Sequence, residues 1–359
     1  MKRLLRHASQ LVPALLAMAL LAFTLRTADI GRAIDLIRAL GPRIPLLVLP
    51  NLVAISAEAV GWWLAFSRLG GRPRLRSLLG VRFMSDAVML GLPSGAVISE
   101  SLQPYLLKRR CGVPFEIGIV AGLGRKFLVV LSHGLFLAAS VVLAWPALAH
   151  ASRTAIGRGG LPWLLFAGAI TLVAVAIATA AAGVHGRLAD RAHRGLDRFG
   201  GRWLGTWLER NALRFQSADH QLAAFFRQNK AGLLPPLLAY LFAWLARAVE
   251  TLLFLRLLGV DVGLSSAMVI ETSLILVRAL AVPVPAGLGV QDAGYVLCLR
   301  GLGVADATTV GAAFVLLKRG KDLFWIAFGF LLLAVTRQKG ESTLPDHPDP
   351  QTEGPIRMS

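Results

Sequence analysis

Cysteine is scarce in this chain of 359 residues, and the familiar motifs of soluble enzymes are absent. Only Cys111 and Cys298 are present, and neither lies at metal-ligand spacing from other ligand-type residues. This argues against a disulfide framework and against a zinc site. The chain also has no G-x-S-x-G motif, phosphate-binding loop or dinucleotide-binding fingerprint. We therefore expect no metal, no cofactor and none of the enzyme classes that these motifs mark.

Acidic residues are few as well: 20 Asp and Glu stand against 38 Lys and Arg, for a formal net charge of +18. A strongly basic chain raises the question of nucleic-acid binding. Here, however, the basic residues lie in the loops between apolar segments, and membrane proteins concentrate Lys and Arg in their cytoplasmic loops. Membrane topology explains this distribution better, so we expect no nucleic-acid partner.

Apolar sequence is abundant. Hydrophobic residues make up 55% of the chain, and the mean hydropathy is +0.63. Several runs approach the ~20 apolar residues needed to cross a bilayer. They are Leu11–Leu25, Ile44–Phe66, Phe127–Leu148, Leu161–Ala182, Leu233–Leu258 and much of Ala305–Val335. The predicted fold class is all-α, a polytopic integral membrane helical bundle.

Loop charges predict the orientation of the bundle. The N-terminus, the Arg-rich stretch 68–82, the segment 183–230 and the stretch after the last span, at 337–339, are basic. The loop 259–266 has no basic residue. The positive-inside rule therefore predicts a multi-pass protein of a bacterial-type cytoplasmic (inner) membrane, with both termini cytoplasmic. No Ala-x-Ala cleavage site follows the first run, so we interpret this run as a retained signal anchor.

The chain is expected to form one transmembrane domain over residues 1–340, with halves at 44–182 and 233–336. The cytoplasmic segment 183–230 joins them and carries nine basic and four acidic residues. It suits an amphipathic helix on an anionic leaflet or, equally, a solvated connector. The tail 341–359 is rich in Pro, Asp and Glu and is expected to be disordered.

Two hydrophobic stretches, Gly91–Glu100 and Val282–Asp292, are interrupted in the same way. Each combines Pro, Gly and a carboxylate where a membrane helix has to unwind, at Pro93, Gly95, Pro283, Pro285, Gly287 and Gly289. Exposed backbone at membrane depth is tolerated only in protein or beside a watery cavity. Paired breaks in corresponding halves are a pointer to a transporter's binding site. We predict two re-entrant hairpins that enter from opposite faces.

An internal repeat supports two inverted halves. Ala57–Gly70 aligns with Ala246–Gly259 at an offset of 189, with six of fourteen positions identical. The loop charges orient the two copies in opposite directions. The alternative is chance similarity between helices rich in Ala, Leu and Val.

Charged residues within the apolar segments are candidates for a polar cavity. A charge near the bilayer centre costs about 2.5–3.5 kcal/mol even on the lenient insertion scale, so each needs a partner. Helical spacing predicts that Arg247 pairs with Glu250 and Arg319 with Asp322. The alternative is that such pairs only hold helices together. The candidate cavity-lining residues are Glu100, Arg125, Arg247, Glu250, Glu271, Arg278, Asp292, Arg319 and Asp322.

The second half resembles a known family. The segment Pro283–Tyr295, followed by Lys318-Arg-Gly-Lys-Asp322, resembles the lysylphosphatidylglycerol synthase transmembrane (flippase-like) family. The sequence of this segment is most similar to that of the hopanoid-biosynthesis-associated branch of the family. The chain departs from the family pattern with Ala286 where Gly is frequent and Asp292 where Glu is usual. The soluble aminoacyl-transferring domain of the full synthase is absent from this sequence, so the resemblance does not imply lysyl transfer.

The resemblance implies a carrier that moves a lipid or lipid-linked headgroup across the membrane. Membrane lipids with an anionic or lipid-linked headgroup are the expected partners, with lipid-biosynthesis enzymes as further ones. One alternative is a membrane transferase that acts on a lipid-linked substrate, using Asp29 or Asp35 outside or the spaced pair His185 and Asp190 inside. Another is an accessory subunit of a lipid-synthesis complex.

Overall fold

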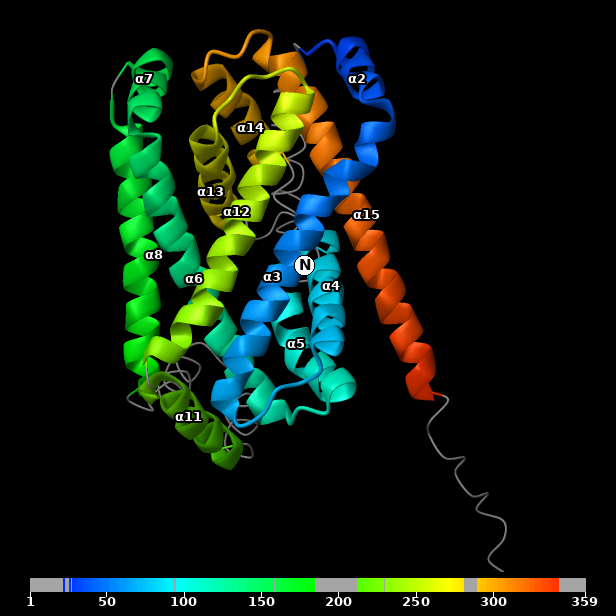
Figure 1. Cartoon of the computed structure of the whole chain (residues 1–359), viewed down its shortest axis with the longest axis vertical. Coiled ribbons are helices and arrows are strands. Elements are labelled where there is room, and N and C mark those ends of the chain that lie inside the picture. Colours follow the sequence, from blue (N-terminus) through cyan, green and yellow to red (C-terminus); the bar gives the residue numbers. More distant parts are fainter. Residues whose placement is uncertain are drawn as a thin grey trace, which may run out of the picture.

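The computed structural model describes residues 22, 26, 28–92, 95–157, 159–184, 212–228, 230–280 and 289–341. Every regular element in this part of the chain is a helix, which confirms the predicted all-α class (Figure 1). In chain order the elements are α2 (Ile30–Ala39), η1 (Gly41–Val48), α3 (Leu49–Phe66), η2 (Ser67–Leu69), α4 (Leu75–Gly91), α5 (Gly95–Cys111), α6 (Phe115–Leu143), α7 (Trp145–Ile156), α8 (Leu161–Val184), α11 (Ala212–Arg227), η3 (Lys230–Leu233), α12 (Leu234–Leu257), α13 (Leu264–Leu280), α14 (Val290–Gly301) and α15 (Ala307–Glu341).

Four helical stretches in the described residues are long and apolar enough to cross a membrane. They are Gly41–Leu69, Phe115–Leu143, Leu161–Val184 and Ala231–Leu257. Three agree closely with the predicted runs, but the run predicted at Phe127–Leu148 was wrong in its bounds. Its helix, α6, begins twelve residues earlier and ends at Leu143, because Pro146 in the first turn of α7 begins a new helix. The predicted run at Leu11–Leu25 lies almost wholly outside the described residues.

The helices form two sets with the same order: one long helix, a helical hairpin, then a second long helix. The first set is α3, the hairpin α4–α5 and α6; the second is α12, the hairpin α13–α14 and α15. The hairpin α4–α5 lies in the lower half of the molecule and α13–α14 in the upper half (Figure 1). Each set's last helix contacts the other set's hairpin, α15 with α4 and α6 with α13. The two sets are therefore interlocked, while the duplication and the membrane face of each hairpin stay predictions.

Small residues bring the two sets together along α3 and α12. Ala54 and Ala57 pack against Ala243 and Ala246, and all four are buried. Close backbone approach at small residues is the usual basis of helix packing in membranes. This contact fixes the centre of the bundle, and the charged cavity described below lies beside it.

Both predicted helix breaks occur. In the first, α4 ends at Gly91, Leu92 is extended, and α5 begins at Gly95. A Cβ atom at Gly95 would collide with the carbonyl oxygens of Val88 and Met89, so only glycine fits this return. In the second, α14 starts after Gly289, whose φ of 78° is left-handed. The other predicted break residues, Pro93, Pro283, Pro285 and Gly287, lie outside the described residues.

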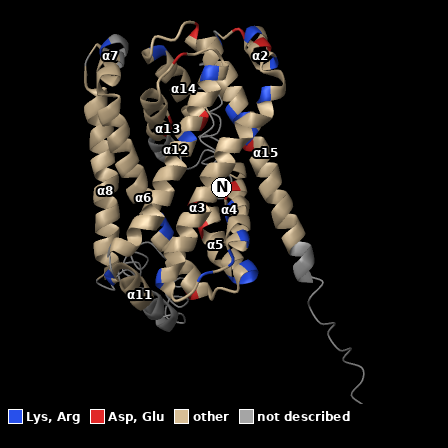
Figure 2. Cartoon of the chain, in the orientation of Figure 1, with Lys and Arg blue, Asp and Glu red and all other residues tan. Residues whose placement is uncertain are grey.

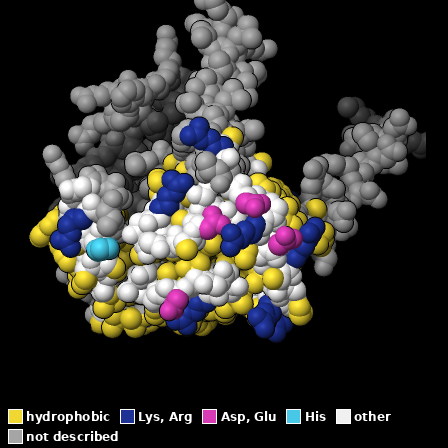
Figure 3. Space-filling model, turned by 90° about the horizontal axis from the view of Figure 1, so that it is seen from above, with side chains coloured by type: hydrophobic (Ala, Val, Ile, Leu, Met, Phe, Trp, Pro, Cys, Tyr) yellow, Lys and Arg dark blue, Asp and Glu magenta, His cyan; other side chains and the backbone are white. Residues whose placement is uncertain are grey.

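Charged residues lie mainly at the two ends of the bundle and near its centre (Figure 2). Seen from the end that carries α2 and α7, they gather on the end face, with hydrophobic side chains around it (Figure 3). The flank formed by α8 is apolar and largely exposed, with Trp163, Leu164 and Ile177 all more than half exposed. An exposed apolar flank between polar ends is what a bilayer-spanning bundle requires.

Two Arg residues assigned to a cytoplasmic loop are buried instead, which corrects the prediction. Arg82 lies inside α4 and is 4% exposed. Arg68 is buried in η2, where its guanidinium donates to the carbonyl oxygen of Phe225 at 2.7 and 3.0 Å. The loop is short because α4 already begins at Leu75. The positive-inside rule counts the cations of a loop, and it does not distinguish an exposed guanidinium from one that is buried and hydrogen-bonded in the protein interior.

The described end of the 183–230 segment is the helix α11, which packs against α6 and α8. Its Leu222, Phe225 and Phe226 are buried in the same apolar cluster as Phe127. These apolar side chains are thus covered by protein, so this part of the segment does not place them in a lipid leaflet. The rest of the predicted amphipathic stretch, with His185 and Asp190, lies outside the described residues.

A matched pair of glycine substitutions in α15 tests the interlocked packing. A Cβ atom at Gly329 would collide with the backbone of Phe83 in α4, whereas one at Gly320 meets nothing within 4 Å. We expect Gly329→Ala to lower stability by about 1–3 kcal/mol, the usual cost of overpacking. Gly320→Ala should be neutral or stabilising by up to about 1 kcal/mol through helix propensity. Thermal unfolding of both variants in detergent measures the difference, and equal midpoints would contradict this packing.

Candidate functional site

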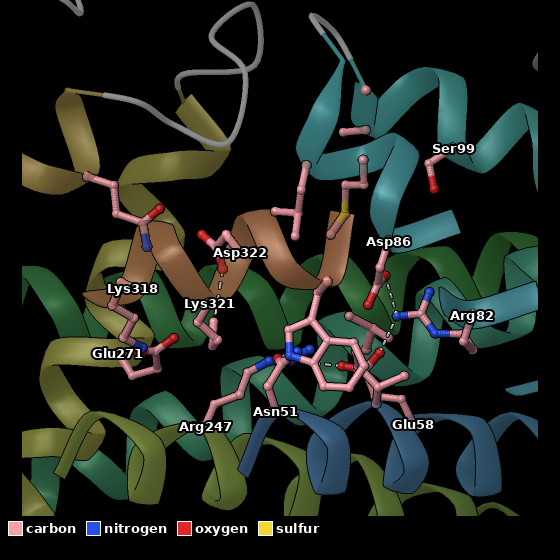
Figure 4. Close-up of a pocket in the computed structure, with 18 of the residues that line it drawn as sticks. Asn51, Glu58, Arg82, Asp86, Ser99, Arg247, Glu271, Lys318, Lys321 and Asp322 are labelled. Carbon is pink, nitrogen blue, oxygen red and sulfur yellow. Dashed lines mark hydrogen bonds and ion pairs between the residues drawn. The ribbon is translucent and has the colours of Figure 1, made fainter. Parts of the chain in front are cut away.

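A polar cavity of about 360 Å³ lies at the centre of the bundle, where both helix sets meet. Its walls come from α3, α4, α5 and α6 of the first set and from α12, α13, α14 and α15 of the second (Figure 4). Seven acidic and seven basic side chains line it: Glu58, Asp86, Glu100, Glu250, Glu271, Asp292 and Asp322, with Arg82, Arg125, Lys126, Arg247, Lys318, Arg319 and Lys321. The cavity is therefore highly charged but balanced.

Glu58 joins the two sets at the centre of the cavity. Its carboxylate accepts from Arg82 at 2.5 Å and from Arg247 at 2.8 Å. Arg82 also donates to Asp86, one turn farther along α4, at 2.8 Å. The side chains of Glu58, Arg82 and Asp86 are nearly buried, with 5–11% of their surface exposed. Helices α3, α4 and α12 are thus linked by one continuous ion-pair chain (Figure 4).

Lys318 of α15 is the centre of a second ion-pair cluster, which lies within the second set. Its ammonium group donates to Glu250 at 2.9 Å, to Thr251 at 3.0 Å and to Glu271 at 3.1 Å. Lys321 donates to the same oxygen of Glu250 at 2.9 Å. Two lysines and two glutamates therefore neutralise one another between α12, α13 and α15, with side chains no more than 10% exposed.

Each hairpin is bonded to the long helix that follows it. In the first set Arg125 of α6 donates to Glu100 of α5 at 2.7 Å. In the second set Arg319 of α15 donates to Asp292 of α14 at 2.6 Å. Asp292 also accepts from the backbone N–H of Gly289 at 2.9 Å and so caps α14. The two pairs occupy equivalent places in the helix order, and each holds a helix that begins just after a break.

Some polar atoms of the cavity wall are buried and have no hydrogen-bond partner in the described structure. They are Arg82 Nε, Arg125 Nε, Gln103 Oε1, Glu250 Oε2 and Trp325 Nε1. Buried polar groups are nearly always satisfied in folded proteins, so these atoms are placed to bond with water or with a ligand in the cavity. Both free donors and free acceptors are present, which suits a ligand that carries polar groups of both kinds.

Eight of the nine predicted side chains line this cavity. The ninth, Arg278, lies in α13, but its side chain is outside the described part of the chain. One predicted pairing was wrong: Arg247 and Glu250 do not bond one another, because Glu58 takes Arg247 while two lysines take Glu250. The predicted contact of Arg319 with Asp322 is present at 3.6 Å. The roles of these residues in ligand binding stay predictions.

Several charged residues of the wall were missed as candidates. The loop charges place Arg82 in a cytoplasmic loop, and the candidates predicted from the sequence do not include Glu58, Asp86 or Lys126. One signal was available, since the internal alignment places Glu58 opposite Arg247 with opposite charge. In the structure these two equivalent positions bond one another at 2.8 Å across the packed helices α3 and α12. The opposite charges at these two aligned positions are therefore the signal from which this contact between the halves could have been predicted.

His133 packs in the interior of the bundle rather than in the cavity wall. It is buried, its Nε2 lies 3.2 Å from the Thr272 carbonyl oxygen, and its ring stacks on Trp244 at 4.5 Å. Among the described residues, no group of three or more His, Cys, Asp and Glu side chains is placed to hold a metal ion.

Apolar spanning helices around a buried, charged cavity define a multi-pass membrane protein with an internal polar site. The comparison with protein families agrees. The family described as the lysylphosphatidylglycerol synthase TM region matches residues 10–334, and the chain belongs to this family. No curated protein and no solved structure matches the chain. The hopanoid-associated branch is not part of the family match and stays a prediction.

Substitution of Glu250 tests whether the lysine cluster depends on it. Glu250→Gln would leave Lys318 and Lys321 buried with one carboxylate fewer, and removing one partner of a buried ion pair costs about 3–5 kcal/mol. The matched control is Asp35→Asn, since Asp35 pairs with Arg38 on the surface with both side chains more than 70% exposed. Exposed pairs contribute little to stability. Thermal unfolding in detergent should show a much lower midpoint for Glu250→Gln and an unchanged midpoint for Asp35→Asn. Similar midpoints in the two variants would show that the lysine cluster does not stabilise the fold.

Proposed function

We propose that this protein is a flippase-like carrier that moves a lipid or lipid-linked polar headgroup across the cytoplasmic membrane. The observation that carries this proposal is the balanced charged cavity between the two interlocked helix sets. Membership of the lysylphosphatidylglycerol synthase TM region family supports a lipid-related role in the membrane. In this proposal the acyl chains stay in the bilayer while the headgroup passes through the cavity.

The charge distribution supports a headgroup rather than an apolar ligand. Arg and Lys side chains bind phosphate through charge-assisted hydrogen bonds, about twice as strong as neutral ones. In the absence of a ligand, the carboxylates satisfy these donors. An anionic headgroup would replace a carboxylate as the partner of one cation, and then of the next. The cations of the cavity wall would therefore stay neutralised throughout. Such exchange avoids the cost of an isolated buried charge, which is several kcal/mol per ion.

The arrangement of the hairpins supports a mechanism with two access directions. We propose that α4–α5 and α13–α14 are re-entrant, enter from opposite membrane faces and belong to an inverted duplication. Carriers with inverted repeats bind at the repeat interface near the bilayer midplane. Here the Glu100–Arg125 and Asp292–Arg319 bonds hold the two hairpins to α6 and α15. Release of one bond at a time would open the cavity toward one face.

A membrane transferase is the main alternative, and one experiment separates the two. A carrier makes no new covalent bond, so purified protein with a lipid-linked substrate should return that substrate unchanged. Among the residues suggested for an enzyme, Asp29 caps α2 and Asp35 pairs with Arg38 on the surface. Product formation by purified protein in detergent would favour the enzyme, and activity only in a complex with lipid-synthesis enzymes would favour an accessory subunit.

Loss of the second hairpin bond should stop translocation. The movement of fluorescent NBD-phosphatidylglycerol across the membrane of proteoliposomes is measured by dithionite quenching. We expect Asp292→Asn and Arg319→Ala each to lower its rate to that of protein-free vesicles. Insertion and the gel-filtration profile should be unchanged. The matched controls are Asp35→Asn and Arg38→Ala, which alter an exposed pair in the same way. If both cavity variants translocate lipid at the wild-type rate, these residues have no role in translocation. If the wild-type protein itself translocates lipid no faster than empty vesicles do, the carrier proposal is wrong.

The proposed orientation is tested by single cysteines in a Cys111→Ser, Cys298→Ser background. Gly71 and Gly263 are exposed, have no left-handed φ angle and have no tight neighbour, so both accept a cysteine. Loop charges put Gly71 in the cytoplasm and Gly263 outside. A membrane-impermeant maleimide applied to intact cells should label Gly263→Cys and leave Gly71→Cys unlabelled until the membrane is broken. Labelling of the Gly71 variant alone would show that the orientation is the opposite of the predicted one. Equal labelling of both variants would contradict the predicted topology.

A further inference from the structure

One charged pair of the cavity wall reaches the surface of the bundle. Lys126 of α6 and Glu100 of α5 bond at 3.2 Å, and their side chains are 56% and 37% exposed. The equivalent carboxylate of the second set, Asp292, is only 2% exposed. The cavity is therefore open between α5 and α6 and closed at the corresponding place in the other set. We name the opening formed by Ala96, Glu100 and Lys126 the lateral mouth.

The lateral mouth lies within an apolar surface. Val97 precedes Glu100 by one turn on α5 and is 61% exposed, and Leu123 precedes Lys126 by one turn on α6 and is 42% exposed. Lys126 is the twelfth residue of α6, about 16 Å along the helix axis from its first residue. In a candidate span of 29 residues, this depth lies inside the apolar layer. The mouth therefore faces lipid rather than an aqueous end of the molecule.

Positive charge is in excess at the mouth. Arg125 and Lys126 both donate to the same oxygen of Glu100, at 2.7 and 3.2 Å. One carboxylate thus compensates two cations. Arg125 is 5% exposed, and its Nε has no hydrogen-bond partner in the described structure. A half-exposed cation and an unsatisfied buried donor, adjacent in sequence, are suited to receive an anion that comes from the surface.

We propose that the lateral mouth is the site where an anionic lipid headgroup docks from the adjoining leaflet, with Lys126 as its first contact. This proposal deepens the carrier function and rests on it. A charge at this depth in hydrocarbon is costly unless it has a partner. An anionic headgroup, drawn sideways from the bilayer, supplies that partner while its acyl chains lie against Val97 and Leu123. Arg125 then receives the headgroup deeper in the cavity, in exchange for Glu100.

Site-specific photocrosslinking in nanodiscs tests this docking. A benzoylphenylalanine at Val97 reports on lipid at the mouth, and one at Leu164 of α8, 69% exposed, reports on bulk lipid. The nanodiscs contain equal amounts of phosphatidylglycerol and phosphatidylcholine. We expect the ratio of crosslinked phosphatidylglycerol to phosphatidylcholine at Val97 to exceed that at Leu164 by roughly two- to five-fold, the range of one exposed ion pair. Equal ratios at the two positions would overturn the proposal.

Three variants assign the effect to Lys126. Lys126→Gln should bring the Val97 ratio down to the Leu164 value, and Lys126→Arg should keep it high because the charge remains. Arg109→Gln removes an exposed cation of α5, the helix that carries Val97, outside the cavity and should not change the ratio. An unchanged ratio in Lys126→Gln, or the same decrease in Arg109→Gln, would show that Lys126 does not select the lipid.

The outcome is separable from that of the carrier proposal. If the wild-type protein translocates NBD-phosphatidylglycerol but phosphatidylglycerol is not enriched among the crosslinks at Val97, the docking proposal is wrong and the carrier proposal is supported. Enrichment at Val97 without any translocation would support the docking site and refute the carrier.

Discussion

The architecture depends on one constraint: a charge removed from water in an apolar bundle must meet an opposite charge. Taking an ion out of water costs several kcal/mol even after relaxation. Glu58 meets this requirement for Arg82 and Arg247 together, and Lys318 does so for Glu250 and Glu271. The Glu58–Arg247 pair joins residues that are 189 positions apart in sequence and links the two helix sets. The pairs of Lys318 hold α12, α13 and α15 of the second set together, and the cavity lies between the sets.

Glycine and alanine make this ionic centre possible, because they bring backbones close enough for short side chains to meet. Gly95 allows α5 to return directly beneath the last turn of α4, which places Glu100 within reach of α6. The alanine contact between α3 and α12 likewise puts Glu58 beside Arg247. Broken helices and close packing thus serve the same purpose: they bring polar groups into the apolar interior of the bundle, where they meet partners of opposite charge.

The predictions that succeeded were those that depend on local pattern. Hydropathy located α3, α8 and α12, and the Pro and Gly clusters located both helix breaks. The predictions that failed concerned partners. Spacing along one helix allowed Arg247 to pair with Glu250, but spacing says nothing of a carboxylate that approaches from α3. Arg82 was misplaced for a related reason, since the positive-inside rule counts a cation near a loop without knowing whether it is buried.

By itself, the sequence determined the class of protein, its family resemblance, the two interruptions and most of the charged residues around the cavity. Each of these follows from composition, run length or short motifs, which are properties of the chain in one dimension. Only the tertiary structure decided which cation meets which carboxylate, that a cavity remains between the two sets, and that Glu100 is exposed while Asp292 is buried. Those outcomes depend on distances between helices, and such distances arise from packing that no linear pattern encodes.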